Sequence, residues 1–360
     1  MIRKYIDKEN NFIDFFNHRT GEYLRTGIIE NGKDTGVDPF MRSYPSLLDI
    51  GIMGSCKNAK YCKIGCYQGK VNRPNMSLET FKSIIDQSKD KTYEIALGGN
   101  GSPNEHEDFV EIVKYAYDNG VIPNYTTSGI ELTDEQIKAT KDYCGAVAVS
   151  FYRTDYTYSA INKFIEAGVK TNIHYVLGND SIDEAIQRLK DNDFPKGINA
   201  VVFLLYKPVG CVKEGNMLVY DDPRVQEFYS IIDNNKFDFK VGLDACNLPG
   251  VINFSKKINL DATTPCDGGS FSAYVTPDNF MLPCSFDTMD RRYAVSLDEN
   301  TIEEVWNSEQ FESFRNFHRY GCGGCKNQNE CRSGCPIRPE INLCKREEKV
   351  YESKVGLCNK

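Results

Sequence analysis

The sequence lacks any long apolar run. No window in its 360 residues approaches the roughly 18 consecutive apolar residues that a membrane-spanning helix requires. The N-terminal stretch MIRKYIDKENNFIDFF is charged throughout, so it does not have the basic, apolar and small-residue segments of a secretory signal peptide. These two absences predict a cytoplasmic protein that does not insert into a membrane.

Positive charge is also scarce. The chain has 43 Lys and Arg residues against 51 Asp and Glu residues, which gives a formal net charge of -8. Because phosphate recognition relies on a surplus of Lys and Arg on one face, this balance argues against general nucleic-acid binding. Apolar residues make up 40% of the chain, which is enough for a substantial core. The length fits one large domain with a smaller appendage.

Cysteine, by contrast, is abundant and unevenly placed. Of the 14 cysteines, three lie in SCKNAKYCKIGCY at residues 55–67, and eight lie between residues 266 and 358. Only Cys144, Cys211 and Cys246 lie between these two groups. Because a reducing cytosol disfavours disulfides, metal binding or catalysis is the predicted use of the two groups.

Residues 46–245 alternate strand-like and helix-like segments. Short apolar runs such as GAVAVSFY have the length and β-branched content of buried strands, and amphipathic segments such as TDEQIKATKDYC separate them. Thr133 and Gln136 fit a capping box at the start of that segment. Six successive βα units predict a parallel sheet covered by helices, either an open doubly wound sheet or a full or partial barrel. The predicted strands include residues 46–53, 92–97, 145–152, 170–177 and 199–206, and the predicted helices are residues 107–118, 133–144, 156–167 and 181–191.

Two features occupy the loops after the first two strands, where α/β enzymes bind their ligands. The first is the trio Cys56, Cys62 and Cys66. Three thiolates suit a [4Fe–4S] cluster with one open iron, and a zinc site completed by a distant ligand is the alternative. The second is GGNGSP at residues 98–103, whose glycines let the backbone approach a ligand and turn its N–H groups toward it.

The strand, the cysteine-rich loop, the glycine turn and the repeated βα units together resemble the radical S-adenosylmethionine enzymes. The usual cysteine spacing of that family is C-x3-C-x2-C, whereas this chain has C-x5-C-x3-C. The resemblance implies a partial (β/α)6 TIM-type barrel over residues 46–245, with one [4Fe–4S] cluster on Cys56, Cys62 and Cys66. It also implies that S-adenosylmethionine contacts Gly98, Gly99, Asn100, Ser150 and Arg153.

Asn100 and Arg153 are expected to contact the amino group and the carboxylate of S-adenosylmethionine, respectively. Asn100 replaces the acidic residue with which the family receives the amino group of S-adenosylmethionine, and backbone carbonyls can serve the same purpose. Arg153 follows the fourth predicted strand and is the expected partner of the carboxylate, since a guanidinium group binds that group bidentately. The alternative for Ser150 and Arg153 is an ordinary role at the mouth of the barrel.

The C-terminal cysteines resemble the SPASM extension of the same enzymes. CDGGSFSAYVTPDNFMLPC, at residues 266–284, predicts two strands joined by a turn at residues 277–279. The resemblance implies that residues 246–360 hold one or two auxiliary [4Fe–4S] clusters, with residues 1–45 as a lead segment before the barrel. A pair of zinc ribbons is the alternative. One auxiliary cluster would use Cys322, Cys325, Cys331 and Cys344. The other would use Cys266, Cys284 and Cys335, with Cys246 as the candidate fourth ligand.

The resemblance implies a radical reaction. An electron donor such as flavodoxin or ferredoxin reduces the first cluster, and S-adenosylmethionine is cleaved to a 5′-deoxyadenosyl radical. The radical abstracts hydrogen from a carbon of the substrate. Members with this extension mostly modify ribosomally made peptides or proteins by crosslinking, epimerisation or oxidation. A peptide or protein is therefore the predicted substrate.

Asp287 is the candidate catalytic side chain outside the clusters. Sulfatase-maturing members carry an Asp directly after the second hairpin cysteine, where this chain has Ser285, and Asp287 lies two residues further on. Because only residues 1–45 precede the first predicted strand, a separate leader-binding protein is a further expected partner. The alternatives are a radical dehydrogenase acting on a small molecule or carbohydrate, and a non-enzymatic iron–sulfur or zinc carrier.

Overall fold

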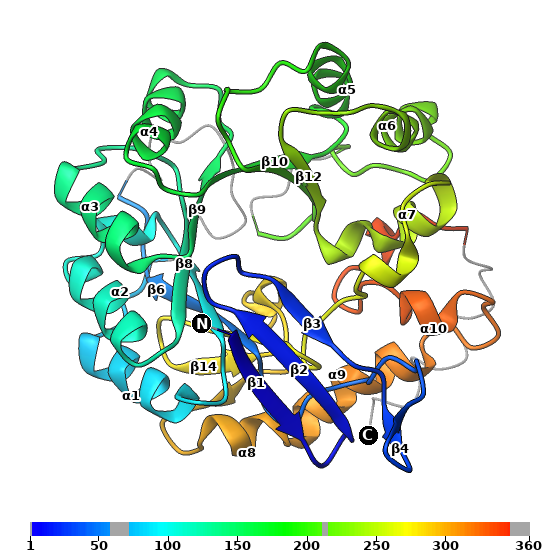
Figure 1. Ribbon diagram of the computed structural model, residues 1–360, viewed down its shortest axis with the longest axis horizontal. Coiled ribbons are helices and arrows are strands. Elements are labelled where there is room, and N and C mark those ends of the chain that lie inside the picture. The colour runs from blue at the N-terminus through cyan, green and yellow to red at the C-terminus, as the bar shows by residue number, and fades with distance from the viewer. Residues whose placement is uncertain (1, 58–71, 211–214, 346–360) are drawn as a thin grey trace. The chain divides into compact units, whose positions relative to one another are not determined.

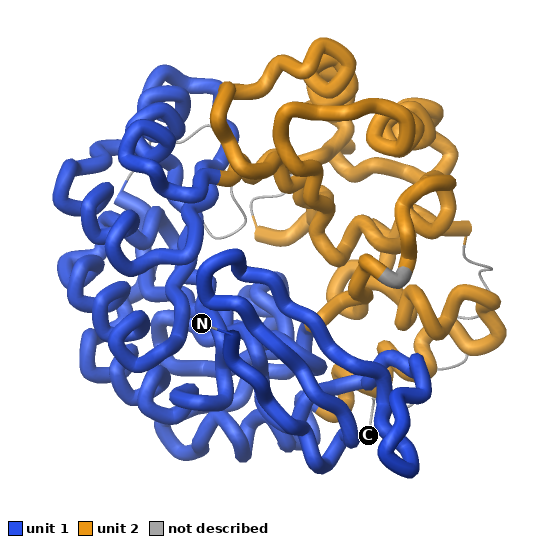
Figure 2. The backbone as a smooth tube through the Cα atoms, in the orientation of Figure 1, with its two compact units in different colours: residues 1–64, 68–171, 268–311 blue, residues 65–67, 172–267, 312–360 orange. Residues whose placement is uncertain are grey.

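The structure is a computed structural model that describes residues 2–57, 72–210 and 215–345. The chain forms two compact units, coloured separately in Figure 2. Unit 1 comprises Met1–Ile64, Gln68–Thr171 and Gly268–Phe311, and unit 2 comprises Gly65–Tyr67, Asn172–Asp267 and Glu312–Lys360. The domain boundaries expected near residues 45 and 245 remain a prediction.

Parallel strands joined by helices form the centre of unit 1. The strands pair in chain order, and Figure 1 shows the helices that connect them. Three of the four helices bury large apolar side chains. This order confirms the predicted α/β class. The strands are β6 (Leu47–Met53), β7 (Glu94–Gly99), β8 (Ile122–Thr127) and β9 (Ala146–Ser150), and the helices are α1 (Leu78–Ser88), α2 (Phe109–Asp118), α3 (Asp134–Tyr143) and α4 (Asp155–Glu166).

Local sequence explains where these helices begin and how they pack. The predicted capping box at the start of α3 is present, with Thr133 and Gln136 each accepting a hydrogen bond from the backbone of the other. The ring of Tyr125 on β8 lies 5.1 Å from that of Phe109 on α2 and 6.5 Å from that of Phe164 on α4. These edge-to-face contacts fasten two helices to one strand.

The N-terminal residues form a sheet that the sequence analysis did not predict. Strands β1 (Ile2–Asp7), β2 (Phe12–Asn17) and β3 (Tyr23–Arg25) pair antiparallel, and a short hairpin of β4 (Ile29–Glu30) and β5 (Lys33–Asp34) follows. One face of β2 is buried, and it includes the carboxylate of Asp14. Arg42 pairs with Asp14 at 2.8 Å, and both side chains are fully buried.

The predicted hairpin between residues 266 and 284 is confirmed. Strands β13 (Ser272–Val275) and β14 (Phe280–Leu282) pair antiparallel, and Asn279 takes the left-handed conformation in the turn. Strand β13 also pairs parallel with β6, a contact that the sequence analysis did not predict. The hairpin therefore extends the sheet of unit 1, and β15 (Val295–Ser296) and α8 (Ile302–Trp306) follow it.

Unit 2 contains three further parallel strands and the C-terminal helices. The ring of Phe203 lies 5.3 Å from that of Tyr175 and 5.0 Å from that of Phe228, which forms an aromatic core. In the described part of the chain, no helix is both long and apolar enough to cross a membrane. The strands are β10 (Thr171–Leu177), β11 (Ala200–Leu205) and β12 (Lys240–Leu243), and the helices are α5 (Ile182–Asp191), α6 (Pro223–Asn234), α7 (Leu248–Phe254), α9 (Glu309–Tyr320) and α10 (Gln328–Cys331).

Candidate functional site

The glycine turn begins inside β7. The strand continues through Gly98 and Gly99, two residues beyond the predicted end at residue 97. Gly99 has φ +111°, and a Cβ atom there would lie 2.5 Å from the carbonyl oxygen of Met53. A Cβ on Gly98, by contrast, would meet no atom of the described residues within 4 Å. Only glycine therefore fits at position 99 against the backbone of β6, whereas among the described residues nothing crowds Gly98.

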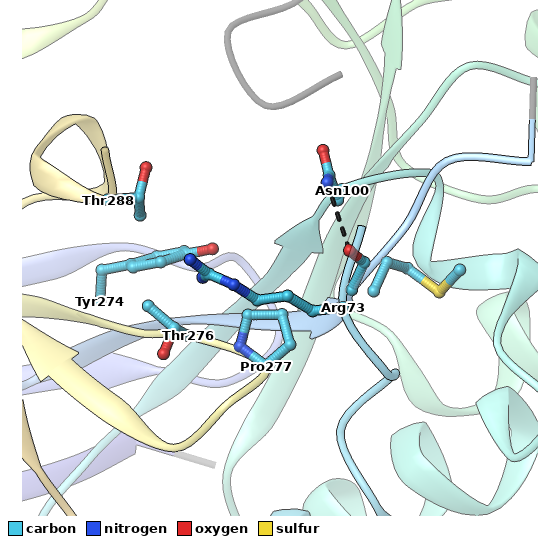
Figure 3. Close-up of a pocket in the computed structure, with 8 residues that line it drawn as sticks. Arg73, Asn100, Tyr274, Thr276, Pro277 and Thr288 are labelled. Carbon is cyan, nitrogen blue, oxygen red and sulfur yellow. Dashed lines mark hydrogen bonds between the residues drawn. The ribbon is translucent and has the colours of Figure 1, made fainter. Parts of the chain in front are cut away.

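The rest of the turn lies against the segment that carries Cys56. The backbone N–H of Asn100 donates to the carbonyl oxygen of Met53 at 2.7 Å, and its side-chain amide donates to that of Gly54 at 3.2 Å (Figure 3). Gly101 has φ +137°, and a Cβ atom there would lie 3.5 Å from the Cα of Cys56. Cys56 and the glycine turn are thus neighbours. Cys62 and Cys66 lie outside the described residues.

Hydroxyl and amide groups connect the loops after β7 and β8. The Ser102 and Ser128 hydroxyls lie 2.9 Å apart, and the Thr127 hydroxyl donates to the Asn104 side chain at 2.7 Å. These bonds hold the glycine turn in place independently of any ligand.

Ser150 and Arg153 lie at the end of β9, as expected. Ser150 is half-buried as the last residue of the strand, and Arg153 is exposed. Arg153 has φ 59°, an uncommon conformation for a residue with a side chain, and its guanidinium group donates to the Phe151 carbonyl oxygen at 3.1 Å. The expected contacts of both residues with a ligand stay a prediction.

A small pocket, with room for about one water molecule, adjoins the glycine turn (Figure 3). Most of the residues that line it could not be predicted from the sequence, because they come from segments that are distant in the chain. Pro277, Thr276 and Tyr274 come from the hairpin, and Arg73 comes from the segment before α1. The lining residues are Met53, Gly54, Arg73, Asn100, Tyr274, Thr276, Pro277 and Thr288.

Arg73, the charged residue among those that line the pocket, shares a carboxylate with Arg291. Asp278 lies 3.3 Å from the Arg73 guanidinium group and 2.8 Å from that of Arg291. Burial alone would raise the pKa of Asp278, but the hydrogen bond from Arg291 and the two positive charges bring it below its usual value. Because one carboxylate is shared by two guanidinium groups, the pocket can accept a carboxylate or a peptide carbonyl group.

Asp287 is fully buried in the turn Ser285–Asp287 after the hairpin. Its carboxylate accepts a hydrogen bond from the backbone N–H of Tyr293 at 2.9 Å. Burial raises the pKa of Asp287, and the backbone hydrogen bonds from Tyr293 and Arg292 oppose that rise. Asp287 thus holds the loop that supplies Thr288 to the pocket, and its catalytic role stays a prediction.

In unit 2 the structure brings together two of the predicted cluster ligands. Cys246 lies in the turn Ala245–Asn247, and the neighbouring Cys335 thiol, together with burial, raises the pKa of the Cys246 thiol. The backbone N–H of Arg338 donates to the Cys335 sulfur at 3.3 Å. Two cysteines supply only part of the ligand set that a cluster needs.

The other predicted ligands are less closely grouped. The backbone N–H of Cys325 donates to the carbonyl oxygen of Cys322 at 3.0 Å, and Cys331 ends α10. Cys266 and Cys344 belong to unit 2, whereas Cys284 belongs to unit 1. Within residues 2–57, 72–210 and 215–345, no three His, Cys, Asp or Glu side chains converge as metal ligands would. The two auxiliary ligand sets therefore stay predictions.

A buried ion pair lies beside Cys246, and the sequence analysis missed it. The ammonium group of Lys207 lies 2.8 Å from the Asp244 carboxylate and donates to the Leu205 carbonyl oxygen at 3.0 Å. The Lys207 side chain is 5% exposed. The available signal was a lysine directly after the buried strand of VVFLLY, where a charged residue without a partner would be costly.

Comparison with known proteins places these features in a family context. Residues 266–335 match the SPASM family, which is described as an iron-sulfur cluster-binding domain. The mycofactocin maturase MftC of Mycolicibacterium smegmatis is 24% identical over 344 residues, which cover 84% of this chain and 83% of MftC. The predicted SPASM extension is therefore confirmed.

Solved structures share the fold. Streptococcus suis SuiB bound to the precursor peptide SuiA has a TM-score of 0.69 at 15% identity and covers 96% of this chain and 98% of its own. SuiB bound to S-adenosylmethionine has a TM-score of 0.67 at 16% identity over 86% and 78%. Native anSMEcpe with bound AdoMet has a TM-score of 0.57 at 14% identity over 85% and 95%. Residues 266–335 of the chain are therefore similar to a SPASM iron-sulfur cluster-binding domain, and the chain shares the α/β fold of SuiB and anSMEcpe.

Proposed function

We propose that the protein is a radical S-adenosylmethionine enzyme that modifies a ribosomally made peptide or protein. The observation that carries the proposal is the contact between the glycine turn and the segment of Cys56. Gly99 packs against the backbone of β6, and Gly101 packs against the backbone of the segment that carries Cys56. Among the described residues, nothing lies within 4 Å of where a Cβ of Gly98 would be. A turn built in this way presents main-chain groups to a ligand beside a thiol.

The residues of this region fit the cofactors that the fold implies. Cys56, Cys62 and Cys66 would hold a [4Fe–4S] cluster, and the open space at Gly98 would admit the methionine part of S-adenosylmethionine. When bound, the reduced cluster and S-adenosylmethionine supply a 5′-deoxyadenosyl radical. Ser150 and Arg153, at the end of β9, would bind the carboxylate of S-adenosylmethionine.

The relatives favour a peptide substrate. SuiB was solved with a precursor peptide, MftC is a maturase, and anSMEcpe was solved with AdoMet and the Cp18Cys peptide. The pocket beside the glycine turn is too small to enclose a peptide, but Arg73, Tyr274 and Thr276 in its lining offer donors for a peptide carbonyl group at its mouth. We propose that the peptide lies across this mouth.

The remaining partners follow from this assignment. The first cluster needs an external one-electron donor, for which a flavodoxin or ferredoxin is suitable. A separate leader-binding protein would deliver the peptide. Auxiliary clusters would be held by two sets of cysteines, Cys322, Cys325, Cys331 and Cys344 in one and Cys246, Cys266, Cys284 and Cys335 in the other.

Reductive cleavage of S-adenosylmethionine tests the proposal. The protein is purified without oxygen, reconstituted with iron and sulfide, and supplied with dithionite and S-adenosylmethionine. We expect the wild type to form 5′-deoxyadenosine and a Cys56/Cys62/Cys66→Ala variant to form none. The matched control is Cys144→Ala, which removes a thiol at the end of α3 and should retain the activity. If the iron-loaded wild type forms no 5′-deoxyadenosine, the proposal fails and a carrier function takes its place.

A second variant separates two roles of Asp287. Asp287→Asn retains most of the side-chain volume and one acceptor for the Tyr293 N–H. If Asp287 moves a proton during turnover, this variant should form 5′-deoxyadenosine but modify the peptide slowly. Normal modification by Asp287→Asn would leave Asp287 with the structural role alone.

A further inference from the structure

We propose that the outward face of the N-terminal sheet binds the same face of a second copy of this chain, so that the protein forms a two-fold symmetric dimer. Two observations carry the inference. The face is apolar although it is exposed to solvent, and the two opposite charges on it are placed so that they fit a copy of the same face. The inference stands apart from the proposed function and does not depend on it.

Strands β1, β2 and β3 cover unit 1 with one face and leave the other outward (Figure 1). Exposure alternates along β1 and β2, and the register sets the less exposed positions opposite one another, as where Tyr5 pairs with Asp14 and Asp14 with Arg25. The alternate positions therefore share the outward face. They include Ile2, Lys4, Ile6, Ile13, Phe15 and Leu24.

This outward face is apolar. Ile6 pairs with Ile13 and Phe15 pairs with Leu24, so these side chains are neighbours across the strands. Ile6 and Leu24 are 53% and 69% exposed, and Ile2 is 67% exposed. An antiparallel sheet with one face in water normally carries polar residues on that face. A group of exposed apolar side chains in that place indicates an interaction surface.

Two opposite charges lie at the two edges of the face. Lys4 is exposed on β1, and Phe15 separates it from Leu24 on β3. The carbonyl oxygen of Glu22 accepts a hydrogen bond from the backbone N–H of Asn17 at 2.9 Å, which places Glu22 two residues before Leu24 on the same face. An acidic or a basic partner would meet a like charge at one of these edges. A second copy can meet an opposite charge at both.

A two-fold axis parallel to β2 brings the matching parts together. It sets β1 of each copy over β3 of the other and the two Phe15 side chains near the axis. Lys4 of each copy then lies over the edge of the other copy that carries Leu24 and Glu22. Sheets that pack face to face lie about 10 Å apart, a separation that long side chains from both sheets fill. The result is an apolar centre between two Lys4–Glu22 contacts, as in an interface with a polar rim.

Substitutions on the face should weaken the dimer and leave the chain folded, and each acts twice because of the symmetry. Leu24→Lys adds a charge to the apolar part at an exposed position and should give a monomer. Lys4→Glu sets like charges against Glu22 and should raise the dissociation constant about tenfold or more. Adding Glu22→Lys to Lys4→Glu exchanges the two charges and should return the constant toward the wild-type value. Val219→Lys, at a position of unit 2 that is 55% exposed, is the matched control and should leave the constant unchanged.

The experiment is sedimentation equilibrium of the full-length protein over a wide range of concentrations. Thiols are kept reduced so that cysteines do not link the copies, and denaturant unfolding checks that each variant is folded. A wild-type dimer that Leu24→Lys dissociates and that the charge exchange recovers supports the inference. A wild type that stays monomeric at the highest concentration, a dimer that Leu24→Lys leaves intact, or a charge exchange that recovers nothing would overturn it. If Leu24→Lys does not fold, the comparison of Lys4→Glu with the charge exchange decides alone.

Discussion

The two compact units each contain a buried ion pair with the same short separation, and the two pairs have different surroundings. Arg42 and Asp14 in unit 1 are fully buried and 2.8 Å apart, while Lys207 and Asp244 in unit 2 are 2.8 Å apart and 5% and 18% exposed. The guanidinium group of Arg42 lies 3.7 Å from the ring centroid of Tyr5. In the unit 2 pair, the Asp244 carboxylate also accepts a hydrogen bond from the Asn247 side chain at 2.6 Å.

The neighbours of the unit 1 pair give it a structural role. Arg42 donates to the carbonyl oxygens of Tyr44 and Lys91, and its own carbonyl accepts from the indole of Trp306. That pair ties the N-terminal sheet to the rest of unit 1. Loss of the unit 1 pair should therefore appear in the free energy of unfolding.

The largest expected effect comes from breaking the unit 1 pair. Asp14→Ala leaves the Arg42 guanidinium buried without its carboxylate and should lower the free energy of unfolding by about 3–5 kcal/mol. Denaturant unfolding of the anaerobic protein measures it. The matched control is Asp118→Ala, which breaks an exposed pair with Lys114 and should cost no more than about 0.5 kcal/mol. Equal losses in the two variants would contradict the structural role of the Arg42 pair.

The unit 1 pair also illustrates what the sequence could not predict. Regular βα units are visible in a sequence because their apolar runs and caps are local, as at the capping box of Thr133. FIDFFN does alternate, but Asp14 stands on its buried face, and the partner that makes this tolerable lies 28 residues away. When the partner cannot be identified from the sequence, an Asp is interpreted as an exposed residue. The N-terminal sheet was therefore not predicted.

For the candidate site, too, the sequence predicted the local motifs and not the contacts between distant segments. The glycine turn and the cysteine groups are local motifs and could be found. Arg73 and Thr276 line one pocket only because β13 pairs with β6, and Lys207 meets Asp244 only because β11 and the end of β12 are adjacent. Contacts of this kind depend on tertiary pairing, which no short spacing encodes.

The second largest effect is expected at the glycine turn of unit 1, whose conformation depends on close backbone packing and not on charge. Gly99→Ala introduces a Cβ atom 2.5 Å from the Met53 carbonyl oxygen at a residue with φ +111°. We expect a loss of more than about 2 kcal/mol in the free energy of unfolding. Gly98→Ala is the matched control, because its Cβ meets no atom within 4 Å and should leave the stability nearly unchanged. A stable Gly99→Ala variant would show that the turn is less tightly packed than the structure implies.

The smallest effect concerns Asp49, a half-buried carboxylate whose charged neighbour is another carboxylate. Burial, together with the charge of Glu94, raises the pKa of Asp49 to about 7. In the unfolded chain an Asp ionises near pH 4. Between these two pH values the folded protein binds more protons than the unfolded chain, so the free energy of unfolding falls as the pH rises and stays low above pH 7.

Asp49→Asn removes that dependence and sharpens the contrast with the paired Asp14. We expect the variant to be more stable than wild type by about 1–2 kcal/mol at pH 8, with little difference at pH 4. Unfolding measured at several pH values tests this. Asp118→Asn, an exposed carboxyl, should show no such pH-dependent gain. A difference between Asp49→Asn and wild type that is independent of pH would contradict the raised pKa.

The central claim is that S-adenosylmethionine binds at the glycine turn beside the cluster of Cys56, Cys62 and Cys66. The most direct measurement is the electron paramagnetic resonance spectrum of the reduced, iron-loaded protein with and without S-adenosylmethionine. We predict that S-adenosylmethionine changes the spectrum of wild type and that Gly98→Val, which fills the open space at the turn, abolishes the change. An identical wild-type spectrum with and without S-adenosylmethionine would contradict the claim.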